Sequence, residues 1–115
     1  DIAAPIFDVM LLGLGPDTHV ASLFPERDEV LIDDVSITTV SVTDSPKPPP
    51  LRVSMTVPVL NNSRSVFFIV AGADKAEAVD IARSCEANTA DVPASWVRGQ
   101  RDTVWWMDTA AAGDS

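Results

Sequence analysis

A single histidine lies just after a glycine turn, and its neighbours suit it for acid–base chemistry. His19 comes shortly after Gly13-Leu14-Gly15 and is separated from Asp17 by one residue. An imidazole can take up a proton near neutral pH, and a nearby carboxylate can orient the ring. The pair therefore predicts a general base. A surface or helix-capping histidine, beside an aspartate that only shapes a turn, would give the same pattern.

The glycine turn indicates where a ligand would bind. Gly13 and Gly15 allow a tight turn and a close approach of the backbone, and the amides that follow can hold an anion. The turn follows an apolar run at residues 7–12, and α/β folds bind ligands beyond the carboxyl ends of their strands. Thr18 stands where a dinucleotide fingerprint has its third glycine, which excludes a Rossmann NAD site.

The composition limits the partners. The 115 residues include 17 Asp and Glu but only 8 Lys and Arg, for a net charge of −9, which argues against nucleic acid and anionic membranes. An anionic ligand would need the few basic residues to be gathered around it. No apolar run approaches the ~20 residues of a membrane span, and no signal peptide is evident. The single Cys85 favours a reducing cytoplasm, and we expect it to be a packed residue rather than a nucleophile.

The elements that must position these residues follow an α/β pattern. Residues 7–12 and 66–70 are apolar runs bounded by glycine, typical of parallel strands covered on both faces. Residues 74–87 have the apolar spacing of a helix. Further strands are expected at residues 35–43, 51–56 and 103–107. We therefore expect one unit, residues 1–115, with a partly parallel sheet and flanking helices.

A proline-rich stretch separates two of these strands. Residues 46–50 contain four prolines, which impose an extended loop with few N–H donors. A stiff connector is a sufficient explanation of this composition. Residues 57–62 then begin a short helix that has a proline in its first turn.

Taken together, these motifs resemble those of the 6-phosphogluconolactonase family. The chain is similar to the C-terminal half of such an enzyme, in the fold shared by lactonases and glucosamine-6-phosphate deaminases, and the resemblance spans nearly all of its length. The matching stretches occur in the family's order at residues 7–25, 44–56, 58–61, 70–76 and 104–108.

The resemblance implies hydrolysis of 6-phosphogluconolactone to 6-phosphogluconate, a step of the oxidative pentose phosphate pathway, without metal or organic cofactor. His19 would be the general base and Asp17 would steady it, while Gly13 and Gly15 would line the substrate site.

The resemblance also implies which side chains hold the substrate phosphate. Lys75, in the family's Gly-x-x-Lys-Ala segment that begins at Gly72, is the first candidate. Arg52, after the proline loop, is the second, and Lys47 is the third. Without the motifs, each of them would be read as an ordinary solvated side chain.

Two alternatives remain open at this stage. A deaminase-like enzyme would need a carboxylate shortly after the histidine, but Phe24 precedes Pro25 there. A non-catalytic, sugar-phosphate-binding fragment is the other alternative, and Thr18 favours it because the family motif has a glycine at this position. If that position requires a positive φ, a β-branched residue is strained there.

The length of the chain leads to a further expectation. Members of the family have an additional N-terminal half that this chain lacks. We therefore expect an uncovered apolar face or edge of the sheet, which would bind the missing half or a second copy of the chain. The isolated chain could then lack activity.

Overall fold

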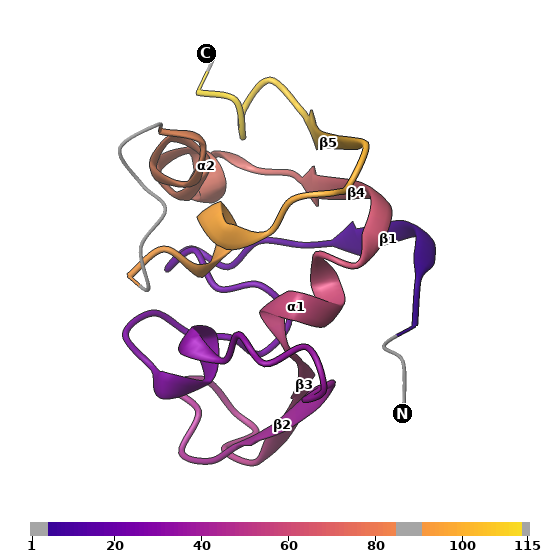
Figure 1. Ribbon diagram of the computed structural model, residues 1–115. Helices are drawn as coiled ribbons and strands as arrows, with labels where there is room; N and C mark the ends of the chain where they lie inside the picture. The colour runs from indigo at the N-terminus through magenta and orange to yellow at the C-terminus, as the bar shows by residue number, and fades with distance from the viewer. Residues whose placement is uncertain (1–4, 85–90, 114–115) are drawn as a thin grey trace.

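Three parallel strands form the central sheet of the protein, which a computed structural model describes over residues 5–84 and 91–113 (Figure 1). Their spatial order is β1 (Phe7–Leu12), β4 (Ser63–Val70) and β5 (Asp102–Met107). The predicted parallel pairing of the first two apolar runs is confirmed, because Val9 is in register with Ser65 on the neighbouring strand. The α/β fold class is confirmed with it.

The chain between β1 and β4 forms a separate antiparallel hairpin. It consists of β2 (Thr39–Val42) and β3 (Arg52–Met55), joined by the proline loop. Figure 1 shows this hairpin set apart from the parallel sheet. One turn of helix, α1 (Val57–Leu60), has a proline in its first turn as predicted, and it returns the chain to the sheet.

One face of the parallel sheet is buried and forms part of the hydrophobic core. Helix α2 (Ala76–Arg83) follows the short 3₁₀ turn η2 (Ala73–Lys75) and buries its apolar side against this face. Two further 3₁₀ turns, η1 (Asp28–Leu31) and η3 (Pro93–Trp96), complete the described elements. The shared core contains Met10, Leu12, Val66, Phe68 and Val70 from the strands and Ala78, Val79 and Ala82 from α2.

The opposite face of the sheet is open. Val9 is 48% exposed, Leu11 60%, Ile69 54% and Trp106 56%. The expectation of strands covered on both faces is therefore wrong for these residues, because nothing in the described chain packs over this side. The expectation of an uncovered apolar face is confirmed. We call Val9, Leu11, Ile69 and Trp106 the open face.

Replacing apolar side chains of the open face with lysine should reduce the apolar surface that the chain exposes. We expect Val9→Lys combined with Ile69→Lys to lower the binding of a hydrophobic dye by roughly half, since exposed apolar patches bind such probes. The circular dichroism spectrum should not change, because both side chains point away from the core. Val35→Lys is the matched control, since Val35 is 71% exposed but lies outside the sheet. Equal dye binding by the double variant and by the Val35→Lys control would contradict the prediction.

Two predicted elements are shorter than expected. The strand expected at residues 35–43 is limited to β2, because Asp34 accepts hydrogen bonds from the Ser36 amide and hydroxyl and forms a turn there. The predicted helix at residues 74–87 begins with the η2 turn, and its described helical part ends at Arg83. Cys85 and the expected end of this helix lie outside the described residues.

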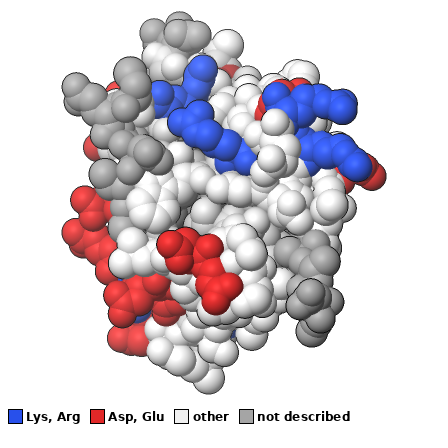
Figure 2. Space-filling view, in the orientation of Figure 1, with Lys and Arg blue, Asp and Glu red and all other residues white. Residues whose placement is uncertain are grey.

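Charge is unevenly distributed over the surface. In Figure 2, Lys and Arg gather over the upper part of the molecule, and Asp and Glu gather over the lower part, around η1 in the segment between β1 and β2. Within the described ranges, no helix is long and apolar enough to cross a membrane.

Candidate active site

The loop after β1 closes on itself through its backbone. The Thr18 amide donates to the Gly15 carbonyl at 2.9 Å, and the Gly15 amide donates to the His19 carbonyl at 3.0 Å. These two hydrogen bonds fold residues 15–19 into a tight turn at the carboxyl end of the strand. The turn brings His19 back over the residues that precede it.

Asp17 and His19 form a close pair within this turn. Asp17 Oδ1 lies 2.6 Å from His19 Nδ1 and also accepts the His19 backbone amide at 3.1 Å. Burial raises the pKa of Asp17, but these hydrogen bonds outweigh it, and the pKa lies below its usual value. An ionised carboxylate only accepts hydrogen bonds, so Nδ1 must donate to it. The lone pair of the imidazole is then on Nε2.

Gly15 leaves the space that the imidazole occupies. A Cβ atom at this position would lie 2.0 Å from His19 Nδ1 and 2.8 Å from Asp17 Oδ1. At Gly13, by contrast, a Cβ atom would meet nothing within 4 Å. The two glycines of the turn therefore have different roles, and only Gly15 is required for the Asp17–His19 contact.

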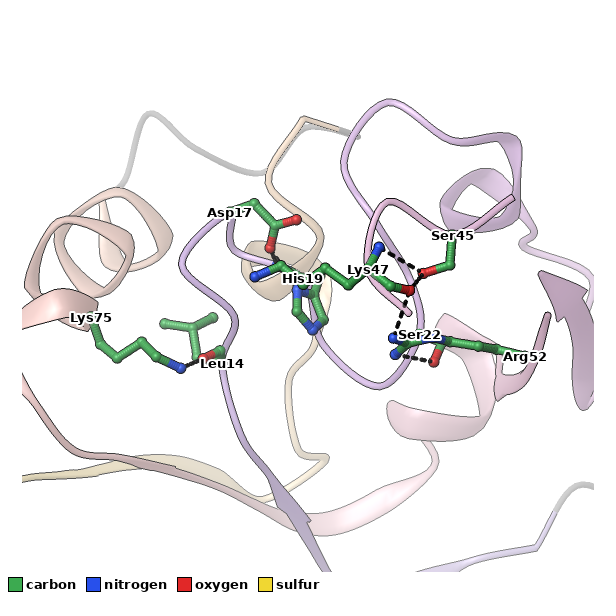
Figure 3. A network of polar contacts seen from close by, with 8 residues as sticks. All are labelled: Leu14, Asp17, His19, Ser22, Ser45, Lys47, Arg52 and Lys75. Carbon is green, nitrogen blue, oxygen red and sulfur yellow. Dashed lines mark hydrogen bonds and ion pairs between the residues drawn. The ribbon is translucent and has the colours of Figure 1, made fainter. Parts of the chain in front are cut away.

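A hollow of about 620 Å³ adjoins this pair. His19, Lys47 and Lys75 are the titratable side chains in its wall. In Figure 3, Lys75 points toward Leu14 from one side, and the Lys47 side chain extends from the proline loop toward His19. Of the other predicted site residues, Gly13 and Gly15 line the hollow, whereas Asp17 and Arg52 do not. The complete lining is Met10, Leu11, Leu12, Gly13, Leu14, Gly15, Pro16, His19, Ala21, Lys47, Met55 and Lys75.

The two lysines reach the hollow from different elements. Lys75 is half-buried and ends η2, five residues after the carboxyl end of β4, and its ammonium donates to the Leu14 carbonyl at 2.5 Å. Lys47 is exposed and belongs to the proline loop. Both ammonium groups are therefore available at the rim, where they could bind an anionic group of a ligand.

Arg52 is occupied by the proline loop. Its guanidinium donates to the carbonyl oxygens of Lys47, Pro48 and Pro49 at 2.8–3.1 Å, and more weakly to Ser22 Oγ at 3.5 Å. The structure thus brings Lys47 and Lys75 to the hollow with His19. Arg52 contacts the proline loop instead and does not line the hollow.

Phe24 is a site residue whose role the sequence did not reveal. Its ring centroid lies 4.6 Å from that of His19, and the guanidinium of Arg52 lies 5.4 Å from the same ring. Phe24 is fully buried, so it supports one face of the imidazole. An aromatic residue inside the histidine motif was the available signal, but the motif alone does not show which side chain it contacts.

Thr18 has the conformation that a glycine would adopt easily. Its φ is +74°, and its buried hydroxyl has no hydrogen-bond partner among the described residues. Position 18 therefore does require a positive φ, which is the case in which we expected a β-branched residue to be strained. The loop nevertheless keeps the Asp17–His19 contact, so the strained threonine is accommodated at a cost in stability.

Replacing Thr18 with glycine should stabilise the protein. We expect Thr18→Gly to raise the free energy of unfolding by about 1 kcal/mol, because relief of the left-handed strain and of the unpaired hydroxyl exceeds the entropy cost of glycine. Urea denaturation would measure the difference. Thr18→Ala is the control, since it removes the hydroxyl but keeps the strained Cβ, and it should recover only part of the gain. A Thr18→Gly protein less stable than Thr18→Ala would contradict this explanation.

The described part of the chain offers no group of three or more His, Cys, Asp and Glu side chains placed to hold a metal ion. The titratable groups in the wall of the hollow are the His19 imidazole and two ammonium groups, and the Asp17 carboxylate contacts the imidazole.

Comparison with known proteins identifies the family. Residues 2–106 match the sequence model of the glucosamine-6-phosphate isomerases/6-phosphogluconolactonase family. The chain belongs to this family. The family includes both enzyme types, so membership alone does not choose between them.

Several relatives that match nearly the whole chain are named 6-phosphogluconolactonases. A 6-phosphogluconolactonase of Streptomyces coelicolor is 50% identical over 96% of this chain, and one of Mycobacterium tuberculosis is 45% identical over 95%. The solved structure of the Trypanosoma brucei 6-phosphogluconolactonase superposes with a TM-score of 0.77 at 27% identity, over 95% of the chain. The chain spans only 41–43% of the length of these three relatives.

Proposed function

We propose that the chain contributes the acid–base pair and the phosphate-binding lysines of a 6-phosphogluconolactonase, which hydrolyses the lactone ring of a sugar phosphate. The observation on which this rests is the hollow that His19 shares with Lys47 and Lys75. A base that shares a hollow with two cations suits a substrate that has an ester at one end and a phosphate at the other.

His19 would act as base and then as acid. Its Nε2 takes a proton from water while the water oxygen forms a bond to the lactone carbonyl carbon. The tetrahedral intermediate collapses by breaking the bond between that carbon and the ring oxygen. The imidazolium returns its proton to the departing ring oxygen, and the products are a carboxylic acid and a hydroxyl group. Asp17 holds Nδ1 throughout and stabilises the imidazolium.

The lysines would act by positioning. An ammonium group forms a strong, charge-assisted contact with a phosphate, and fixing the phosphate fixes the lactone carbonyl relative to His19. Lys75 is the better placed of the two, because its half-buried side chain is already held against Leu14.

The lactonase assignment is favoured over a deaminase because of Phe24. A deaminase of the expected type needs a second carboxylate beside the histidine, and here the fully buried ring of Phe24 contacts the imidazole instead. The non-catalytic alternative is disfavoured by the short Asp17–His19 distance, since binding a sugar phosphate alone does not require an oriented base.

We also propose that the open face is covered by a segment outside these 115 residues. The relatives are more than twice as long as the part that this chain matches. An apolar surface of this kind is normally buried in a folded protein. A second copy of the chain is the alternative occupant, and sedimentation of the 115-residue chain with and without the complementary part of a relative separates the two.

The proposal can be tested in a hybrid protein. In this hybrid lactonase, the chain replaces the 110-residue segment that it matches in the Streptomyces coelicolor enzyme. We expect turnover of fresh 6-phosphogluconolactone above spontaneous opening, and no ammonia release from glucosamine 6-phosphate. A soluble hybrid that binds 6-phosphogluconate without turning over the lactone would favour the non-catalytic alternative, and ammonia release would favour the deaminase.

A further inference from the structure

The proline loop that carries Lys47 has few hydrogen bonds of its own. Its four prolines have no N–H, so the loop cannot pair as a strand would. The Ser45 amide donates to the Pro50 carbonyl at 2.9 Å and closes the base of the loop. Ser45 Oγ accepts the Lys47 amide and donates to the Lys47 carbonyl. The Pro48 and Pro49 carbonyl groups at the tip still need a donor.

Arg52 supplies that donor. Nε donates to the Pro49 carbonyl at 3.1 Å, and Nη2 donates to the Lys47 and Pro48 carbonyls at 3.0 and 2.8 Å. Figure 3 shows the Arg52 guanidinium meeting the loop next to Lys47. A guanidinium has five N–H donors in a rigid plane. With the contact to Ser22, four hydrogen bonds are made, so one N–H remains for any other partner.

The Arg52 side chain also reaches the loop after β1, which carries His19 and Ser22 and which we call the histidine loop. Nη1 lies 3.5 Å from Ser22 Oγ, and the guanidinium lies over the Phe24 ring, which contacts His19. Ser54, also on β3, accepts the Ser22 amide at 3.1 Å. Strand β3 therefore holds the two loops whose side chains meet in the hollow.

We infer that Arg52 is a positioning residue, which fixes the proline loop so that Lys47 faces the substrate phosphate in the hollow that it shares with His19. It acts through Lys47 and does not bind the phosphate itself. This differs from the role that the family resemblance implied for it. The part that concerns the phosphate rests on the proposed function, whereas the part that concerns the loop does not.

The first test measures loop order in the 115-residue chain and needs no activity. We expect Arg52→Lys to lower the ¹⁵N order parameters of the Ser45 and Lys47 amides from ~0.85 towards ~0.6, because a lysine cannot reach three carbonyl groups at once. Arg64→Lys is the matched control, since Arg64 is an exposed arginine on another strand that pairs with Asp8. Unchanged order in Arg52→Lys would overturn the inference.

The second test is a double-mutant cycle in the hybrid lactonase. Arg52→Lys and Lys47→Ala should each raise KM roughly 10-fold with little change in kcat, and the double variant should raise it no further than the larger single effect. If the two effects multiply, Arg52 acts independently of Lys47 and the inference is wrong. An inactive hybrid would count against the proposed function, and the order parameters would still decide whether Arg52 holds the loop.

Discussion

Replacing His19 with alanine in the hybrid lactonase is expected to lower kcat by roughly 10²–10⁴-fold, the usual range for loss of a general base. His19 is the only histidine in the chain, and Asp17 holds its Nδ1 so that Nε2 is the atom able to accept a proton. KM should change little, because Lys75 and Lys47 would still hold the phosphate. Initial rates, with spontaneous lactone opening subtracted, provide the measurement.

Two further variants separate the base from its surroundings. Lys75→Ala should mainly raise KM, because a charge-assisted phosphate contact is lost. Asp17→Asn should keep KM and lower kcat by less than His19→Ala, since the ring would keep its place but not its fixed tautomer. A His19→Ala protein with near-normal turnover would exclude His19 as the base, whatever the other variants showed.

Gly15→Ala should be nearly as damaging as loss of the histidine. The added methyl group would lie 2.0 Å from His19 Nδ1 and 2.1 Å from Cε1, so the imidazole must move. The ring lies at the end of a flexible side chain, and the backbone of the turn can remain. Because a displacement of about 1 Å can reduce catalysis 100-fold, we expect kcat to fall by roughly 10²-fold in a protein that still folds.

The imidazole NMR signals test the cause of this loss. In the unmodified chain, the proton on His19 Nδ1 should show the downfield shift of a short hydrogen bond to a carboxylate. Gly15→Ala should abolish that signal. Gly13→Ala should keep it, because a Cβ atom there meets nothing within 4 Å. If Gly15→Ala retained both the signal and full turnover, the proposed role of this glycine would be untenable.

The fold was predictable where a local pattern determined it. Two apolar runs that end at glycine predicted neighbouring parallel strands, and β1 and β4 are paired in this way. The limits of β2 were not predictable, because the turn that Asp34 makes with Ser36 competes with strand pairing, and the β-branched pattern does not reveal it. The open face was predicted from what a chain of this length lacks, rather than from the strands themselves.

One contact of the candidate site was predictable from residue type and spacing. The spacing of Asp17 and His19 indicated a pair, and the pair is formed. Arg52 could not be assigned from sequence, because its partners are backbone carbonyls whose positions depend on how the prolines fold back. The contact of Phe24 with His19 likewise depends on how the loop after Thr18 turns. Such contacts depend on tertiary geometry, which residue spacing does not encode.

The pairing of β1 with β4 has a consequence for how the protein folds during synthesis. Phe7 is in register with Ser63, and the Lys75 ammonium meets the Leu14 carbonyl across 61 residues of chain. Contacts between such distant residues require closure of a long loop before they contribute any stability, which slows folding. The local β2–β3 hairpin can form earlier. The histidine loop would therefore leave the ribosome well before the lysine that completes its hollow, and a ribosome paused before β4 would hold a nascent chain without a site.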